Sequence, residues 1–233
     1  MKFNLIVPVA ADKPEYSNTL PYVFGLGDDG VTLCVKSIAG LDVAKFDNIY
    51  FTILAKHDAR FCLKEMLQMQ FKRLGWSQAK VVILDKPTSC QPETIYQTIC
   101  KENIEGVVFV KDSYCYFECD LYPKNGVAIY PLEKLPLVDP RNKSYVAVDD
   151  MFYITNIIEK RVVSHYFNAG GYCFEDAALF CKYYERLHKL GHIYLSHIIY
   201  AMMLGKHEFR PFSVHNYKDW GTETLYKIGL MNF

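Results

Sequence analysis

The chain has 233 residues, 51% of them apolar and 15% aromatic, which is enough for one large domain with a substantial core. Its 26 basic and 26 acidic side chains cancel, and this balance argues against a general nucleic-acid binder, which would carry a basic excess. No apolar run approaches the roughly 18 residues that a membrane helix needs, so we expect no membrane insertion. The eight cysteines are scattered and follow no secretory signal, so we predict reduced thiols in a cytoplasmic protein.

Strands and helices alternate in the pattern of the first half of the chain. Short apolar runs, rich in β-branched and aromatic residues, predict strands at residues 3–9, 47–54, 80–84 and 106–110. Amphipathic stretches predict helices at residues 59–74 and 91–101. Such alternation is typical of an α/β domain with a mostly parallel sheet. Ligands bind such sheets beyond the carboxyl ends of the strands, so the segments after Val9 and Val110 are expected at the ligand edge.

Shorter strands dominate the pattern beyond Asp120. It predicts strands at residues 126–130, 144–148, 151–158 and 162–174, followed by helices at residues 175–190 and 196–204. No internal repeat, low-complexity tract or long linker interrupts the sequence, so we expect residues 1–233 to form a single domain. The C-terminal region is rich in tyrosines that suit the core, which is the default, or a homodimer interface: Tyr183, Tyr184, Tyr194 and Tyr200.

Two aspartates are candidates for a magnesium site. Asp112 follows the strand that ends at Val110, and Asp219 precedes an aromatic residue and a turn in Asp219-Trp220-Gly221-Thr222. Phosphoryl chemistry needs a hard cation to bridge phosphate oxygens, and Mg²⁺ is commonly held by one or two carboxylates together with those phosphates. Each aspartate alone also fits an ordinary turn. Their occurrence together favours a metal site formed by residues far apart in the sequence.

Three further segments carry groups suited to a phosphorylated ligand. Lys160 follows Glu159 at a strand end, and its ammonium can neutralise a phosphate; a surface ion pair is the plain alternative. The run Asn168-Ala169-Gly170-Gly171 offers an amide side chain and a close backbone approach, or simply a hairpin turn. The run Arg141-Asn142-Lys143-Ser144 is either a polar surface loop or a contact to an acceptor.

One predicted helix opens with Ser89-Cys90-Gln91-Pro92-Glu93-Thr94. Exposed amide groups at a helix N-terminus can bind a phosphate or the edge of a base. A helix cap without a ligand is the alternative. His188, His192 and His197 lie in the C-terminal region, where the aromatic-rich context favours core or surface positions over a metal site.

Four segments together resemble motifs of the nucleoside-diphosphate-sugar pyrophosphorylases, a sugar nucleotidyltransferase family of the GT-A-like superfamily. In chain order they are Lys111-Asp112-Ser113, Glu159-Lys160, Asn168-Ala169-Gly170-Gly171-Tyr172 and Asp219-Trp220-Gly221-Thr222. The resemblance implies a single three-layer Rossmann-like (GT-A-like) α/β domain with a mixed, mostly parallel central sheet. It also implies a nucleotide-binding half in residues 1–120 and an acceptor-binding half in residues 121–233.

The implied activity is Mg²⁺-dependent transfer of a nucleoside monophosphate from CTP, UTP or dTTP to a phosphorylated sugar or sugar-like acceptor. Pyrophosphate is released, and the product would serve capsule or surface polysaccharide synthesis. The resemblance assigns Mg²⁺ to Asp112 and Asp219, and catalysis to these two residues together with Lys160 and Lys13. Residues assigned to the nucleotide are Pro8, Val9, Ala10, Ala11, Gln91, Glu93, Thr94 and Ser113. Residues assigned to the acceptor are Asn142, Glu159, Asn168, Gly170 and Gly171.

One motif departs from the family pattern. The family has a glycine-rich loop with an arginine after the first strand, where this chain has Pro8-Val9-Ala10-Ala11-Asp12-Lys13-Pro14. Glycines let backbone N–H groups wrap phosphates. Tyr114 also stands where many relatives carry a second acidic residue. Two alternatives therefore stay open, a GT-A-type glycosyltransferase that uses a nucleotide-sugar donor and a relative that binds nucleotides without catalysis.

Overall fold

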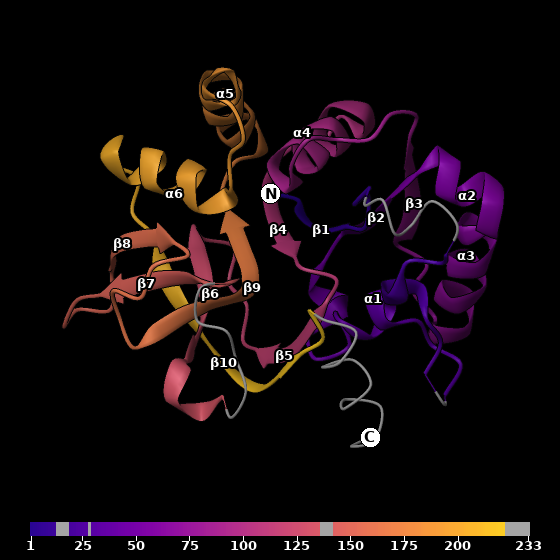
Figure 1. Ribbon diagram of the computed structural model, residues 1–233, viewed down its shortest axis with the longest axis horizontal. Helices are drawn as coiled ribbons and strands as arrows, with labels where there is room; N and C mark the ends of the chain where they lie inside the picture. The colour runs from indigo at the N-terminus through magenta and orange to yellow at the C-terminus, as the bar shows by residue number, and fades with distance from the viewer. Residues whose placement is uncertain (13–18, 28, 136–141, 222–233) are drawn as a thin grey trace.

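The computed structural model describes residues 1–12, 19–27, 29–135 and 142–221 (Figure 1). Its centre is a mixed β-sheet whose strands lie in the order β3-β2-β1-β4-β9-β6-β10-β5. Their bounds, in that order, are Ala79–Leu84, Asn48–Leu54, Phe3–Pro8, Val107–Lys111, Tyr166–Phe174, Gly126–Pro131, Arg210–Asp219 and Cys115–Cys119. A side branch is formed by β7 (Ser144–Val148), which pairs with β9 and with β8 (Ile154–Glu159).

Most strands of the central sheet run in one direction. The pairs β1/β2, β2/β3 and β1/β4 are parallel, and so is β6/β10. Strand β9 runs antiparallel to both β4 and β6, and β5 runs antiparallel to β10. The expected α/β class with a mixed, mostly parallel sheet is therefore confirmed.

Helices cover both faces of this sheet, because its strands are apolar on both sides. Leu5 belongs to the core cluster beneath α3 (Leu63–Leu74) and the short α1 (Leu33–Lys36). The next residue, Ile6, belongs to the opposite cluster, as the alternation of side chains along a strand requires. That second cluster is shared with α4 (Gln91–Glu102), α5 (Ala177–Leu187) and α6 (Leu195–Leu204). The result is the expected three-layer arrangement (Figure 1).

The helix expected at residues 59–74 is interrupted, and this prediction was wrong in detail. The chain forms α2 (Ala55–Phe61) and then α3, with Cys62 between them in the left-handed region at φ 50°. The Cys62 N–H donates to the Asp58 carbonyl at 2.8 Å, and the Lys64 N–H donates to the Asp58 carboxylate at 2.7 Å. These bonds end one helix and begin the next within a single residue.

Apart from short 3-10 helices, three elements of the described residues do not appear among the predicted ones: α1, β5 and β10. The pairing of β5 with β10 matters most for function, because its register places Asp219 opposite Cys115. Since Cys115 lies three residues after Asp112, this ladder brings the two candidate aspartates into the same region of the molecule. Within the described ranges, no helix has both the length and the apolar character needed to cross a membrane.

Candidate active site

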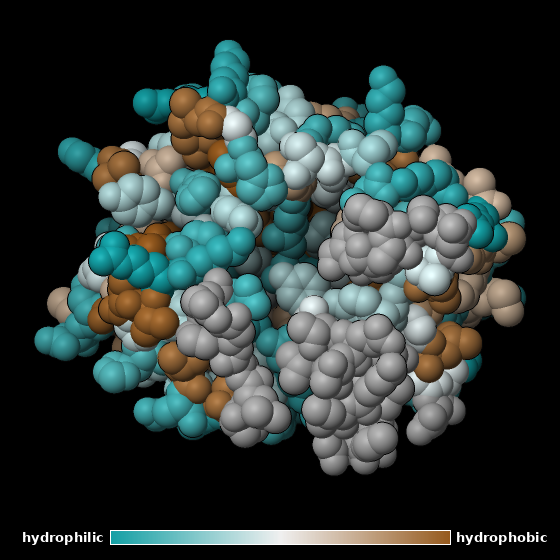
Figure 2. All heavy atoms as spheres, in the orientation of Figure 1, coloured by the Kyte–Doolittle hydropathy of each residue, from teal (hydrophilic) through white to brown (hydrophobic). Residues whose placement is uncertain are grey.

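A cleft of about 840 Å³ opens at the carboxyl ends of β1 and β4. One wall is formed by the segment after β1 and the start of α4, and the opposite wall by β7, β9 and the start of α6. The space-filling view shows a hollow at the middle of this face, with many hydrophilic residues around it (Figure 2). The cleft therefore lies where open α/β sheets bind ligands.

Most residues singled out from the sequence line this cleft. From the predicted nucleotide side they are Pro8, Val9, Ala10, Ala11, Gln91, Thr94 and Ser113. From the predicted acceptor side they are Asn142, Glu159, Asn168 and Gly170, and the remaining members are Asp112, Lys160 and Asp219. The fold thus brings together side chains that are more than 200 residues apart in the sequence.

Three of the singled-out residues are not part of the described cleft lining. The carboxylate of Glu93 accepts hydrogen bonds from the Ser89 N–H and hydroxyl, both at 2.6 Å, and so caps α4. A Cβ built on Gly171 would meet Ala128 and Phe117 at 2.8 Å, so this glycine is packed against the core. Lys13 lies outside the described residues.

Asp112 is buried at the end of β4, with a relative exposure of 4%. One carboxylate oxygen accepts a bond from the Gln91 amide at 2.5 Å, and the other accepts from the Tyr114 hydroxyl at 3.1 Å. Its backbone N–H donates to the Gly170 carbonyl at 2.8 Å, which extends the β4/β9 ladder. Burial raises the pKa of Asp112, and the Gln91 hydrogen bond and the charge of Lys111 oppose that rise. Both oxygens are thus bonded to neutral donors.

Lys111 places a positive charge directly beneath the site. Its side chain is fully buried, and its ammonium donates to the carbonyl oxygens of Asp112 at 2.9 Å and Cys115 at 2.7 Å. The Cys115 sulfur lies 3.0 Å from the same ammonium. These bonds hold the turn between β4 and β5 in one conformation. Because Asp112 lies in this turn, its carboxylate is held in one direction.

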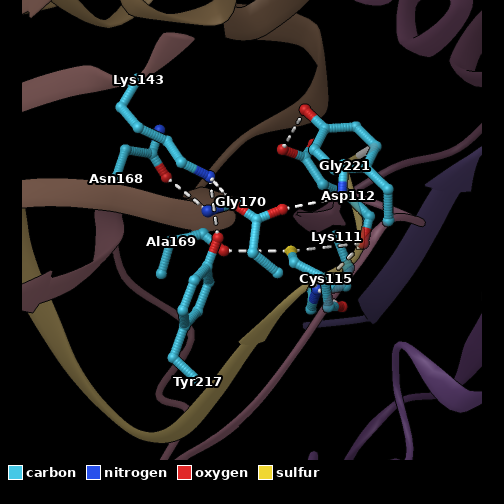
Figure 3. Close-up of polar contacts among 11 residues, drawn as sticks. Lys111, Asp112, Cys115, Lys143, Asn168, Ala169, Gly170, Tyr217 and Gly221 are labelled. Carbon is cyan, nitrogen blue, oxygen red and sulfur yellow. Dashed lines mark hydrogen bonds and ion pairs between the residues drawn. The ribbon is translucent and has the colours of Figure 1, made fainter. Parts of the chain in front are cut away.

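Asp219 forms an ion pair with Lys143. The Lys143 ammonium lies 2.5 Å from one carboxylate oxygen, and the Gly221 N–H donates to the other at 2.7 Å. Lys143 also donates to the Tyr217 hydroxyl at 3.0 Å. Figure 3 shows Lys143 and Tyr217 on one side of Gly170 and Asp112, Lys111 and Cys115 on the other.

The predicted acceptor side holds the exposed ammonium of Lys160 and the partly buried carboxylate of Glu159. Lys160 adopts φ 57°, and its ammonium donates to the Tyr194 hydroxyl at 2.8 Å. Glu159 accepts hydrogen bonds from the hydroxyls of Ser144 at 2.5 Å and Ser196 at 2.7 Å. The adjacent Glu159 and Lys160 therefore do not pair with each other but are held by β7 and by the α6 region.

Asn168 of β9 lines the cleft, and its side-chain amide is buried. Its side-chain oxygen accepts from the Gly170 N–H at 2.8 Å, which fixes the amide in one orientation. Its side-chain nitrogen is buried and makes no hydrogen bond within the described part of the chain. A buried donor without an acceptor is costly. Solvent does not reach this nitrogen, so the structure does not by itself present it to a ligand.

The donor set fits a magnesium ion that completes its coordination with phosphates and water. Within the described ranges, no group of three or more His, Cys, Asp or Glu side chains forms an all-protein metal cage. Mg²⁺ sites built from one or two carboxylates plus substrate phosphates need no such cage. Asp112 suits this role, since each of its oxygens keeps a lone pair beyond the neutral donor it accepts.

No protein-family model matches the chain, and no curated protein matches it in sequence. Solved structures do match. A nucleoside-diphosphate-sugar pyrophosphorylase from Vibrio cholerae RC9 is similar with a TM-score of 0.79 at 14% identity, covering 98% of this chain and 99% of that one. The inositol-1-phosphate CTP transferase from T. maritima has a TM-score of 0.74 at 15% identity, with 98% and 94% covered.

A UDP-glucose pyrophosphorylase complexed with UDP-glucose is similar with a TM-score of 0.75 at 13% identity, and covers 100% of this chain and 98% of that one. At these identities the likeness establishes the fold. The chain therefore has the fold of the nucleoside-diphosphate-sugar pyrophosphorylases and related nucleotidyltransferases, as the sequence motifs led us to expect.

Four residues of the site carried no assignment from the sequence: Lys111, Lys143, Tyr194 and Tyr217. Lys143 belongs to the polar run that contains Asn142, so the sequence drew attention to it but did not predict its ion pair with Asp219. Tyr217 lies two residues before Asp219, a spacing that places both side chains on one face of a strand. That signal was available only once β10 was recognised as a strand. No sequence signal distinguishes the buried Lys111 from a surface lysine.

Proposed function

We propose that this chain is a nucleotidyltransferase that transfers a nucleoside monophosphate from a nucleoside triphosphate to a phosphorylated sugar or sugar-like acceptor, releasing pyrophosphate. The observation that carries this proposal is the shared cleft. It joins the segment after β1 and the start of α4 to Lys160, Asn168 and the two aspartates within about 840 Å³. A cavity of this size holds a nucleotide and a small second substrate.

The reaction needs two phosphates brought into line. An oxygen of the acceptor phosphate attacks the α-phosphorus, a new P–O bond forms, and the bond from the α-phosphorus to the bridging oxygen breaks. Pyrophosphate leaves with that electron pair. Catalysis of such transfers depends mainly on positioning and on neutralising charge.

Each wall of the cleft has a part in this positioning. Asp112 would hold Mg²⁺, which supplies positive charge to the phosphate oxygens. Lys160 would neutralise the attacking phosphate, and the Asn168 amide nitrogen would donate to a hydroxyl of the acceptor. Residues 8–11 and the start of α4 would enclose the triphosphate and the base. The product would be an activated precursor for surface polysaccharide, made in the cytoplasm.

Thermal melting with nucleotides is the first test. CTP, UTP, dTTP, ATP and GTP are compared, each with and without Mg²⁺, because a ligand that binds only the native state raises the melting temperature by mass action. We expect one pyrimidine triphosphate to raise the melting temperature, and to do so mainly with Mg²⁺. The absence of any shift with all five triphosphates would contradict the proposal.

Pyrophosphate release with the selected nucleotide and a panel of sugar phosphates then tests the chemistry. Asp112→Asn removes a charge without changing size, and we expect it to abolish release. The matched control is Asp42→Asn, because Asp42 is exposed and pairs only with Lys45 at 4.0 Å, outside the cleft. Equal loss in both variants would show that the effect is not specific to the site.

A glycosyltransferase that uses a nucleotide-sugar donor is the second candidate. It is favoured by the segment after β1, where Asp12 lines the cleft and Val9, Ala10 and Ala11 stand in place of glycines. The Asp12 carboxylate is paired with the Lys56 ammonium, so what disfavours a triphosphate here is the loss of the glycines whose N–H groups would wrap its phosphates. A melting shift with UDP-glucose or UDP that exceeds the shift with every triphosphate would select this alternative.

A further inference from the structure

Asp219 and Asp112 line the same cleft but differ in their charge partners. Asp112 accepts bonds from two neutral donors, Gln91 and Tyr114. Asp219 has one oxygen on the Gly221 N–H and the other on the ammonium of Lys143, at 2.5 Å. Both side chains of this ion pair are largely buried, with 11% of Lys143 and 10% of Asp219 exposed. The negative charge of Asp219 is therefore already neutralised by the chain.

Lys143 is held in this position by several contacts. Its ammonium also donates to the Tyr217 hydroxyl at 3.0 Å, and it lies 5.4 Å from the centre of the Phe167 ring and 5.5 Å from that of Tyr217. Its backbone carbonyl accepts from the Lys160 N–H at 2.9 Å. Lys143, which directly precedes β7, is thus held both by its side-chain contacts and by the backbone bond to Lys160.

A divalent ion and an ammonium compete for the same carboxylate oxygen. Mg²⁺ requires near-ideal octahedral geometry at about 2.0–2.1 Å from each oxygen. An ammonium at hydrogen-bonding distance occupies the space in front of that oxygen and adds a like charge beside the ion. Among the described residues no ammonium bonds to the oxygens of Asp112, although the charges of Lys111 and Lys143 act on this carboxylate from nearby. The two aspartates are therefore not equivalent ligands.

We propose that Lys143 is a resident cation of the cleft, that it takes the place of a metal ion at Asp219, and that the divalent ion is bound through Asp112 without Asp219. In this arrangement the Lys143 ammonium, rather than a shared metal ion, supplies positive charge to substrate phosphates on the Asp219 side. The expectation that Asp219 is a metal ligand is replaced by a lysine–aspartate pair. This inference rests on the proposed function for the presence of a divalent ion in the cleft.

The test measures binding of Mn²⁺ alone, because free Mn²⁺ gives an electron paramagnetic resonance signal that broadens when the ion is bound. Mn²⁺ is titrated into the native chain and into Asp112→Asn, Asp219→Asn, Lys143→Met and the double variant Lys143→Met with Asp219→Asn. Lys143→Arg serves as the conservative variant that keeps the charge. Circular dichroism and a melting curve confirm that each variant is folded.

We expect Asp112→Asn to weaken Mn²⁺ binding at least about tenfold and Asp219→Asn to change it less than about threefold. Lys143→Met should tighten binding about tenfold, since it frees a second carboxylate. That gain should disappear in the double variant, and Lys143→Arg should behave as the native chain.

Two results would overturn the proposal. One is a loss of Mn²⁺ affinity in Asp219→Asn as large as that in Asp112→Asn, since Asp219 would then be a ligand despite Lys143. This comparison remains decisive if Lys143→Met does not fold. The other is a folded Lys143→Met that binds Mn²⁺ no more tightly than the native chain. Failure of the proposed function is seen separately, as a lack of pyrophosphate release from the native chain.

Discussion

Lys111 carries its charge in a fully buried position and bonds to backbone carbonyls and a thiol. Its ammonium holds the β4/β5 turn, and its charge opposes the rise in the pKa of Asp112 that burial causes. Lys111 is therefore a positioning residue. Under the proposed function it would act on the ligand through the direction and the ionisation of the neighbouring carboxylate.

We expect Lys111→Met to lower the free energy of unfolding by about 1–3 kcal/mol, because the carbonyl groups of Asp112 and Cys115 lose their donor. Urea unfolding measures this change. The control is Lys124→Met, since Lys124 is 69% exposed and pairs with Glu175 at 3.3 Å on the surface. The control should change stability by less than about 0.5 kcal/mol. Equal values for the two variants would show that the buried ammonium has no special role.

Lys160 is an exposed residue that lines the cleft, and its ammonium donates one hydrogen bond to Tyr194. An ammonium has three donors, so two remain for a ligand. We expect Lys160→Ala to raise the KM for the phosphorylated acceptor about 10–100-fold, because the acceptor phosphate loses one charge-assisted hydrogen bond. The melting shift with the nucleotide should stay the same. Steady-state kinetics and thermal melting separate the two effects. A loss of the nucleotide shift would place Lys160 on the other substrate.

At the level of elements, β9 is the strand on which the site depends. It pairs with β4, β6 and β7, and it carries both Asn168 and Gly170. Gly170 adopts φ +87°, and a Cβ there would meet the Asp112 carboxylate and the Cys115 sulfur at 2.8 Å each. This glycine is therefore required both by the backbone conformation and by the close approach of β4.

We expect Gly170→Ala to reduce stability by about 2–4 kcal/mol and to abolish pyrophosphate release, because the added methyl group must displace Asp112. Gly191→Ala is a matched control. Gly191 also has a positive φ, +108°, but a Cβ there meets nothing within 4 Å. The control should lose only the cost of backbone strain, about 1–2 kcal/mol, and keep its activity. Chemical denaturation and the release assay give both values.

The sequence was sufficient for strands that are continuous apolar runs, and insufficient for strands of mixed composition and for a break within a helix. Buried parallel strands such as β1 and β4 are continuous apolar runs, so they were predicted within about two residues. The break at Cys62 depends on two bonds to Asp58, which no periodicity reveals. Strands β5 and β10 have mixed composition, so no apolar run marks them; β5 pairs with β10, and β10 pairs with β6 as well.

The site was predictable to a similar extent. Asp112, Asn168 and Lys160 stand in motifs that can be read from the chain, and all three line the cleft. The partner of Asp219 could not be predicted, because Lys143 is 76 residues away and meets it only through β7, β9 and β10. Motifs therefore identify which residues line the cleft. They do not identify the charges that surround each one.

At the scale of the whole molecule, the cysteines differ in exposure, so their reactivity can be used to follow both unfolding and ligand binding in the cleft. Cys62 and Cys100 are exposed, whereas Cys34, Cys115 and Cys173 are buried, and none of the eight forms a disulfide. Burial raises the pKa of Cys115 to about 11 and that of Cys34 to about 12. These thiols therefore stay protonated at neutral pH, and the thiolate is the reactive form.

We expect a thiol reagent at pH 8 to modify Cys62 and Cys100 rapidly in the native protein and the buried cysteines only when the chain unfolds. All eight should react at once in denaturant. Cys90 is partly buried and lines the cleft, so a bound nucleotide should slow its modification. Mass spectrometry of labelled peptides gives the rate at each site. Rapid native labelling of Cys34 would contradict the packed core.

The crossing of strands between the two halves limits how this protein can be recombined. β5 lies in residues 1–120 but its ladder partner is β10 from the other half, and β4 is bordered by β9. The two halves are therefore not modules that can be exchanged by cutting the chain once. In a chimera with residues 121–233 taken from a relative, β9 and β10 of the relative would have to pair in register with β4 and β5 of this chain. Under the proposed function, new acceptor specificity would be more accessible through substitutions around Lys160 and Tyr194, which leave every ladder intact.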